Sequence, residues 1–223
     1  MERMHFEIDL SGVDTYGEFH TRVKNALELP EYYGENLDAL YDVLTELGEQ
    51  WSITFYNTRE MEEALSFRDR LLSGQGCSFS ASVTADYGDT LQEFSLECEA
   101  DPLGNVEFTV SAPETVAGIT GTMSETGGKL TFDETALQFD LLAEDTLSPV
   151  SAPWLLIKTL RSGCITSVGK EEEMLRLSID DSYRDDALRL DIWLDGDRNP
   201  VRAEVLDEGV RILTVSVRDF QIL

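Results

Sequence analysis

Two patterns of apolar and polar residues divide this chain at about residue 75. Before that point, apolar residues recur at helical spacing between short alternating stretches, which indicates helices between strands. After Gly76 the helical period gives way to many short runs of alternating apolar and polar residues, which is typical of strands. We therefore predict an α+β protein. A small α/β unit with a short parallel sheet occupies residues 1–75, and a large curved antiparallel sheet, a half-barrel with one helix, occupies residues 76–223.

The first part contains two predicted strands and three predicted helices. Thr15 and Glu18 have the spacing of a capping box and open the first helix. Strands that alternate with helices favour parallel pairing, because each helix carries the chain back to the same end of the sheet. The predicted strands are 4–10 and 51–56, and the later helices are 36–47 and 60–72.

The second part contains many predicted strands and one predicted helix, 149–162. Turn signals such as Gly127-Gly128 and Asp195-Gly196-Asp197 separate successive strands and favour hairpins. The predicted strands are 77–85, 91–100, 105–113, 118–124, 129–133, 137–142, 174–180, 187–195, 201–207 and 210–220.

The helix 36–47 has two different faces. Asn36 is a plausible N-cap, and Gly34 before it can adopt a positive φ. The spacing predicts a face packed against a core, formed by Leu37, Leu40, Tyr41, Leu44 and Leu47. The opposite face carries Asp38, Asp42 and Thr45.

The segment 29–42 contains a dense motif, which reads L-P-x-Y-Y-G-x-N-L-D-A-L-x-D. It resembles the barstar family of intracellular inhibitors of secreted bacterial ribonucleases. In that family, this helix and the loop before it occlude the active site of a basic ribonuclease. The resemblance implies that the carboxylate of Asp42 is the main anchor, standing in for a substrate phosphate among arginine and lysine side chains.

The resemblance also implies a set of partner-binding residues in this chain. Two positions depart from the family: Tyr41 stands where barstar has tryptophan, and Leu47 replaces an interface aromatic residue. A later acidic contact of the family has no counterpart that aligns here. The implied partner-binding residues are Tyr32, Tyr33, Gly34, Asn36, Asp38, Tyr41, Asp42 and Thr45.

The strand order of residues 77–223 and the hairpin 193–204 resemble the lipoprotein-carrier-like (LolA-like) fold, a half-barrel with a helix in its concavity. That family implies an apolar cavity for acyl chains, and therefore a possible lipid ligand. The helix residues that would line or plug the cavity are Trp154, Leu155, Leu156 and Ile157. The alternative is that these side chains simply fill a hydrophobic core.

The two resemblances together suggest a fusion, natural or engineered or an error of gene prediction, with its junction between about residues 60 and 76. The expected last strand of the inhibitor-like part is missing unless residues 77–85 supply it. If these residues belong to both sheets, one continuous sheet links the two parts.

The composition limits the kinds of partner. The chain has 223 residues, 44 Asp and Glu against 17 Lys and Arg, and a formal net charge of −27. This charge argues against direct nucleic-acid binding and against adsorption to anionic membranes, whereas a basic protein partner is attracted. No signal peptide and no apolar run of membrane-spanning length is visible, so we expect a cytoplasmic protein without stable membrane insertion.

The sequence contains few groups typical of catalytic or metal sites. The three cysteines, Cys77, Cys98 and Cys164, have no disulfide or metal-ligand spacing and are expected to be buried free thiols. The two histidines, His5 and His20, lie away from any nucleophile motif and are expected at the surface.

Two acidic segments are rich in potential metal ligands, but their sequences do not favour a metal site. Asp195 starts a sequence like a calcium loop, but Pro200 occupies the required glycine position. The acidic cluster around Asp180 and Asp185 is more typical of a solvated turn. We expect a non-enzyme with no cofactor or metal.

The sequence therefore favours a barstar-like inhibitor of a basic ribonuclease. The alternatives are a carrier of lipid or lipopeptide that uses the second part, and a fusion without retained activity.

Overall fold

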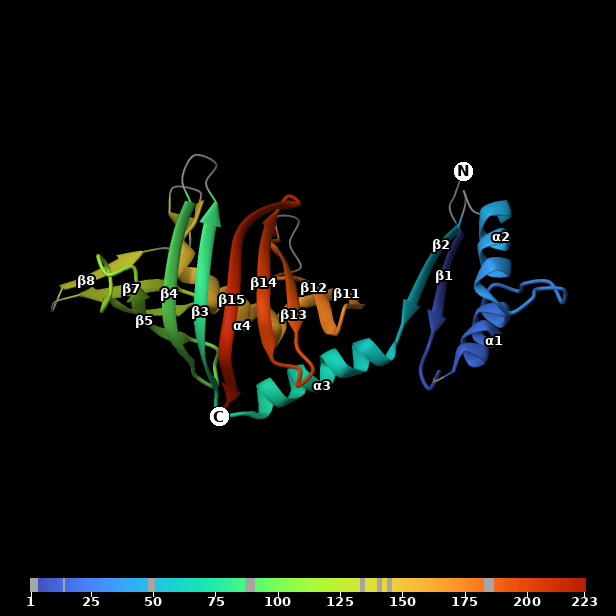
Figure 1. The fold of residues 1–223 in the computed structure, drawn as a ribbon, viewed down its shortest axis with the longest axis horizontal. Coiled ribbons are helices and arrows are strands. Elements are labelled where there is room, and N and C mark those ends of the chain that lie inside the picture. The colour runs from blue at the N-terminus through green and yellow to red at the C-terminus, as the bar shows by residue number, and fades with distance from the viewer. Residues whose placement is uncertain are drawn as a thin grey trace. The chain divides into compact units, whose positions relative to one another are not determined.

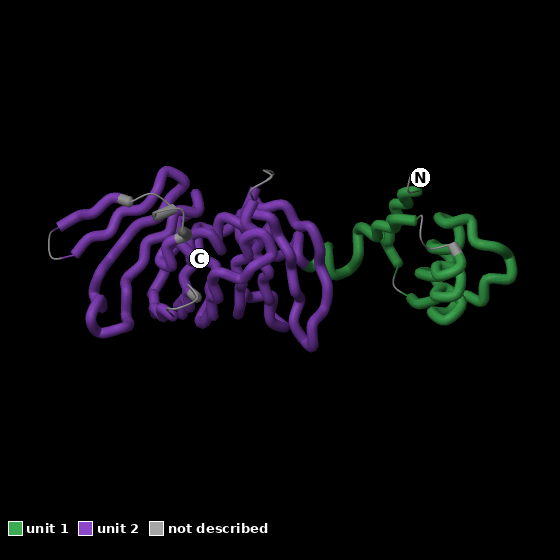
Figure 2. The backbone as a smooth tube through the Cα atoms, turned by 90° about the horizontal axis from the view of Figure 1, so that it is seen from above, with its two compact units in different colours: residues 1–63 green, residues 64–223 purple. Residues whose placement is uncertain are grey.

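The computed structural model describes residues 4–13, 15–47, 51–86, 91–132, 135–139, 142–143, 146–182 and 187–223 (Figure 1). The chain divides into two compact units, residues 1–63 and residues 64–223 (Figure 2). Each unit has its own cluster of buried apolar side chains. The domain boundary expected at residue 75 from the change of pattern stays a prediction.

The first unit holds two strands and two complete helices. The strands pair in parallel, with Met4 opposite Trp51 and Asp9 opposite Tyr56. A third helix begins in this unit and ends in the second. The elements are β1 (Met4–Asp9), α1 (Tyr16–Ala26), α2 (Leu37–Leu47), β2 (Trp51–Tyr56) and α3 (Arg59–Ser73).

The core of the first unit is small. The predicted capping box is present, since the side chains of Thr15 and Glu18 each bind the other residue's backbone. It fixes the start of α1, which contributes Val23 to the core. The other buried apolar residues are Ile8, Leu27, Leu29, Tyr33 and Leu40.

The second unit is built on an open antiparallel sheet of eleven strands, in the order β11-β12-β13-β14-β15-β3-β4-β5-β6-β7-β8. The predicted fold class, a short parallel sheet followed by a large open antiparallel sheet with one helix, is confirmed. The strands are β3 (Cys77–Asp86), β4 (Leu91–Ala100), β5 (Val106–Ala112), β6 (Thr120–Ser124), β7 (Gly127–Phe132), β8 (Thr135–Phe139), β11 (Cys164–Glu171), β12 (Met174–Asp180), β13 (Arg189–Leu194), β14 (Pro200–Asp207) and β15 (Val210–Ile222). A separate pair is formed by β9 (Leu142–Ala143) and β10 (Thr146–Leu147).

One face of this sheet is apolar and the other is polar, because side chains alternate along each strand. In β3, for example, Phe79, Ala81 and Val83 are buried, while Ser80 and Ser82 between them are partly exposed. The helix α4 (Ala152–Ser162), preceded by the 3₁₀ turn η1 (Pro149–Ser151), packs on the apolar face. The sheet lies in front of α4 in Figure 1.

The second half of α3 belongs to the core of the second unit. Ala64, Phe67 and Leu71 are buried there, and the ring of Phe67 lies 6.3 Å from that of Phe220 in β15. Arg68 Nε donates to the backbone oxygen of Leu160 in α4 at 2.8 Å. Apolar burial and these polar contacts join α3 to both α4 and the sheet.

Residues 77–85 do not complete the sheet of the first unit. β3 pairs with β15 on one side and with β4 on the other, so both of its edges are occupied within the second unit. The idea of one continuous sheet through β3 is therefore wrong. The pattern also missed β11, an edge strand that contains Gly169 and Lys170 and lacks strict alternation.

Among the residues that the structure describes, no helix is both long and apolar enough to cross a lipid bilayer. In the same residues, no group of His, Cys, Asp and Glu side chains is arranged to hold a metal ion.

The cysteines differ in burial, which leads to a prediction on their reactivity. Cys77 and Cys98 are buried, while Cys164 is partly exposed. Burial raises the pKa of the Cys77 thiol to about 12, and it also raises the pKa of Cys98. Because the thiolate is the reactive form, a disulfide reagent at pH 8 should modify Cys164 first in the native protein. Mass spectrometry of the labelled peptides checks the order, and early labelling of Cys98 would contradict it.

Substitution of Phe67 tests the assignment of α3 to the second unit. Phe67→Ala leaves a cavity between α3 and the sheet, so we expect a loss of about 3–5 kcal/mol in unfolding free energy. Leu65→Ala on the same helix is the control, because Leu65 is exposed and its loss should change stability by less than about 0.5 kcal/mol. Urea unfolding followed by circular dichroism of the sheet measures both. If Phe67→Ala were as stable as the wild type, α3 would not be part of this core.

Candidate protein-binding site

The start of α2 is held by two side-chain hydrogen bonds. Asn36 Oδ1 accepts from the backbone N–H of Ala39 at 2.8 Å, which confirms Asn36 as the N-cap. The hydroxyl of Tyr16, at the start of α1, accepts from the backbone N–H of Leu37 at 2.9 Å. Two of the unpaired N–H groups at this helix end are therefore satisfied, and α2 is tied to α1.

The loop before α2 reaches the helix through Glu35 and not through Gly34. Glu35 has φ +50°, whereas Gly34 is outside the left-handed region, so the prediction for Gly34 is wrong. Gly34 contributes in another way. A Cβ at this position would lie 3.1 Å from Asn36 Nδ2, and that amide donates to the Gly34 carbonyl at 3.1 Å. Glycine allows this close approach of the backbone to the capping side chain.

The exposed face of α2 is wider than the spacing predicted. Leu40 is buried, and Ala39, Val43 and Leu44 pack partly against the same core. Leu37 is 59% exposed and Tyr41 is 68% exposed, so the prediction that they face the core is wrong. The buried stripe centres on Leu40 and Val43, and the 100° step between residues carries positions 37 and 41 to its solvent side. The side chain of Leu47, also expected in the core, lies outside the described residues.

The exposed face carries both negative charge and aromatic surface. Within the part of the chain that the structure describes, neither Asp38 nor Asp42 forms an ion pair or accepts a side-chain hydrogen bond. Tyr32, in the loop, is 84% exposed. We call this surface the α2 strip; its residues are Tyr32, Asn36, Leu37, Asp38, Tyr41, Asp42 and Thr45.

The polar groups at the ends of the α2 strip bind within the unit. Thr45 Oγ1 donates to the carbonyls of Tyr41 and Asp42, at 2.8 and 2.9 Å, so its hydroxyl faces its own helix. Lys24 Nζ lies 3.3 Å from Glu35 Oε1, and this ion pair places a cation beside the loop and not on the strip. The strip therefore presents uncompensated carboxylates to solvent.

Tyr33 is the one predicted contact residue that lies in the core. It is 4% exposed, and its hydroxyl lies 2.5 Å from Nδ1 of His20, which is fully buried. The rings of Tyr16 and Phe19 pack against His20 at 4.3 and 5.2 Å between centroids. The expectation of a surface His20 is therefore wrong. Burial raises the pKa of the Tyr33 hydroxyl, with smaller contributions from Tyr16 and Glu35.

Sequence reasoning missed Tyr16 and Leu37 as members of this region. The spacing of Leu37 matches that of Leu40 and Leu44 and therefore predicts a core position for it. Tyr16 lies 21 residues before its hydrogen-bond partner, and no local pattern signals a contact of that range.

The four residues predicted to line a lipid cavity all lie in α4. Their side chains are buried within the core cluster between α4 and the sheet. The burial of these four side chains is that of ordinary core residues. They are Trp154, Leu155, Leu156 and Ile157.

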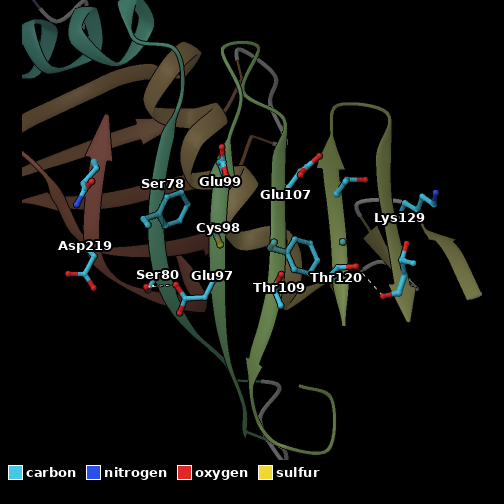
Figure 3. Close-up of a pocket in the computed structure, with 16 residues that line it drawn as sticks. Ser78, Ser80, Glu97, Cys98, Glu99, Glu107, Thr109, Thr120, Lys129 and Asp219 are labelled. Carbon is cyan, nitrogen blue, oxygen red and sulfur yellow. Dashed lines mark hydrogen bonds between the residues drawn. The ribbon is translucent and has the colours of Figure 1, made fainter. Parts of the chain in front are cut away.

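A groove of about 650 Å³ crosses the polar face of the sheet (Figure 3). Hydroxyl groups of serine and threonine line it, together with the carboxylates of Glu97, Glu99, Glu107 and Asp219. Ser80 Oγ donates to Glu97 Oε2 at 2.7 Å. This groove is open and polar, and the sequence patterns did not indicate it.

The α2 strip lies within a segment that matches a known protein family. Residues 3–72 match the family model described as Barstar (barnase inhibitor). The matched segment covers β1 to the last turns of α3, and it includes the α2 strip. The N-terminal part of the chain is therefore barstar-like. The second half of α3 lies within the match although it packs in the core of the second unit.

Several solved structures resemble the chain remotely. A chain of an uncharacterised conserved protein from Thermus thermophilus has a TM-score of 0.41 and 15% identity, covering 74% of this chain and 88% of its own. A LolA superfamily protein from Nitrosomonas europaea has a TM-score of 0.41 and 7% identity, covering 72% and 93%. A chain of the complex of the CwlD amidase with the GerS lipoprotein, from Clostridioides difficile, has a TM-score of 0.37 and 16% identity, covering 75% and 98%.

The buried pair of Tyr33 and His20 leads to a prediction on how firmly the loop before α2 is held. Tyr33→Phe removes the hydroxyl and leaves Nδ1 of buried His20 without its partner, so the first unit should lose about 1–3 kcal/mol of stability. Hydrogen exchange of the α1 and α2 amides should then be at least about fivefold faster. Tyr41→Phe is the control, because Tyr41 is exposed and its hydroxyl bonds to none of the described residues. Unchanged exchange in Tyr33→Phe would show that the pair does not hold the loop.

Proposed function

We propose that the α2 strip binds a basic ribonuclease and occludes its active site. The observation that carries this proposal is the pair of unpaired carboxylates, Asp38 and Asp42, one turn apart on an exposed helix face beside Tyr32 and Tyr41. The barstar match of residues 3–72 supports it, because it covers every residue of the strip. On this proposal the chain acts by binding and not by catalysis.

The charge of the chain favours such a partner in two ways. The net charge of −27 attracts a basic protein at long range and raises the rate of encounter. At short range, a carboxylate on the strip binds arginine or lysine groups that otherwise hold the phosphates of RNA. The proposed anchor is Asp42, with Asp38 one turn before it.

The rigidity of the loop favours tight binding. Asn36 caps α2, Gly34 allows the close approach, and the pair of Tyr33 and His20 holds the loop to α1. A surface that is ordered before binding loses less conformational entropy in the complex. In this proposal Tyr33 and Gly34 position the loop, while Tyr32, Asn36, Asp38, Tyr41, Asp42 and Thr45 form the contact surface.

The alternative of a lipid carrier rests on the resemblance of the second part to the carrier fold. It needs an apolar cavity beside α4, and the four side chains expected there have the burial of ordinary core residues. The carrier function and its lipid ligand therefore stay predictions from resemblance.

Replacement of Asp42 tests the proposed function. The full chain should bind a small basic secreted-type ribonuclease at a 1:1 ratio and stop its cleavage of RNA. Asp42→Ala should weaken binding at least about tenfold, because it removes the carboxylate that the nuclease cations would pair with. Calorimetric titration and an RNA-cleavage assay measure the two effects.

The matched control is Glu173→Ala. Glu173 is an exposed acid in the turn between β11 and β12, so this variant removes one negative charge far along the sequence from the strip. It should keep wild-type affinity, with only a small change in association rate. Binding by the wild type should also weaken as salt rises, because exposed charges are screened. If Asp42→Ala bound as tightly as the wild type, the proposed mechanism would be wrong.

A further inference from the structure

The first turn of α2 donates to two acceptors of different origin. Asn36 Oδ1, which accepts from the N–H of Ala39, belongs to the residue that caps the helix and moves with it. The hydroxyl of Tyr16, which accepts from the N–H of Leu37 at 2.9 Å, belongs to α1. The Asn36 cap therefore fixes where α2 begins, whereas the Tyr16 bond ties its first turn to another element of the first unit.

The apolar core holds α2 only weakly. The helices α1 and α2 pack against the same small cluster of buried residues (Figure 1). Among the described side chains of α2, Leu40 is the one that is fully in this core, and Ala39, Val43 and Leu44 are partly buried. A helix that rests on one buried side chain can tilt about it, so a polar bond at its end contributes more to its direction than in a well-packed bundle.

Tyr16 is itself held by the interior of the unit. Its ring lies edge-on to that of buried His20, with 4.3 Å between the centroids, and His20 Nδ1 lies 2.5 Å from the Tyr33 hydroxyl. Tyr33 is four residues before Leu37. The contacts from Tyr33 to His20, from His20 to Tyr16 and from Tyr16 to Leu37 therefore close a ring, which fixes both ends of the segment 33–37 to α1.

The direction of the first turn decides where the carboxylates of the α2 strip lie. Asp42 is five residues after Leu37, which is about 7.5 Å along the helix axis. A tilt of about 10° at Leu37 would thus displace Asp42 by about 1.3 Å. Charge-assisted hydrogen bonds to a carboxylate have a narrow range of distances, about 2.7–2.9 Å, so a displacement of this size misaligns them.

We propose that Tyr16 is a positioning residue for the α2 strip. Its hydroxyl holds the first turn of α2 against α1 and thereby aims Asp38 and Asp42 at a partner. The effect on binding rests on the proposed function, whereas the effect on the direction of α2 is measurable in the free protein.

The first test uses the free full chain. Tyr16→Phe keeps the ring against His20 and removes only the acceptor for the N–H of Leu37. The Leu37 amide should then exchange its hydrogen about two- to tenfold faster. Residual dipolar couplings of the α2 amides should fall relative to those of α1, because the helix samples more directions. The control is Tyr56→Phe, since Tyr56 is partly exposed and its hydroxyl bonds to none of the described residues.

The second test is calorimetric titration with a small basic secreted-type ribonuclease. Tyr16→Phe should weaken binding about three- to tenfold at a temperature where circular dichroism shows both proteins to be folded. In the Asp42→Ala background the same change should weaken binding less than about twofold, because the main carboxylate that it aims is absent. A role in stability alone would lower the unfolding temperature and leave the affinity of the folded protein unchanged.

A second variant removes the same bond from the other side. Leu37→Pro lacks the donor N–H, and proline is favoured at the first position of a helix. The α2 couplings of Leu37→Pro should fall as in Tyr16→Phe, and the double variant should show no further loss, because both changes delete one bond.

The outcomes separate this proposal from the proposed function. If the wild type does not bind the ribonuclease, the proposed function fails, and the couplings still decide whether Tyr16 holds α2. Unchanged α2 couplings in both Tyr16→Phe and Leu37→Pro would overturn the proposal. It would also be overturned by an affinity loss from Tyr16→Phe that stays as large in the Asp42→Ala background, since Tyr16 would then act without Asp42.

Discussion

The burial of one apolar stripe on α3 decides how the rest of the chain is organised. Ala64, Phe67 and Leu71 pack against α4 and the large sheet, and Arg68 and Arg161 add hydrogen bonds between the two helices. Because α3 is held there, the strand that follows it enters the large sheet between β15 and β4. The second half of the helix that ends the barstar match is thus a structural part of the second unit.

This arrangement leaves the first unit with a small sheet and a small core. Its sheet keeps two strands, and its core contains only six buried apolar residues among those described. Units of this size are marginal in stability, since they bury too little apolar surface against the entropy of ordering the chain. Specific contacts therefore matter more than usual, and the described ones gather around α1: the capping box, the contact from Tyr16 to α2, and the pair of Tyr33 and His20.

The same contacts determine what the α2 strip presents to solvent. Capping and loop packing hold the helix start, so Asp38, Tyr41 and Asp42 stand on a rigid element, where a binding surface needs least ordering. The carboxylates keep their charge available because Lys24, the cation beside the loop, is paired with Glu35. The charges on the polar face of the large sheet are not available in this way. There Arg176 pairs with Asp191 and lies over the ring of Trp193, so these charges are already partnered within the chain.

The sequence by itself determined the features that depend on neighbours along the chain. The capping box at Thr15, the N-cap at Asn36, nearly every strand of the large sheet and the helix α4 follow from local spacing, because each is set within a few residues. The motif at 29–42 likewise located the candidate site. Only the tertiary structure decided which side of α2 is exposed, that His20 and Tyr33 are buried together, and which sheet β3 joins. It also revealed the edge strand β11. These outcomes depend on contacts between residues far apart in the chain, and a local pattern carries no information about which distant surface covers it.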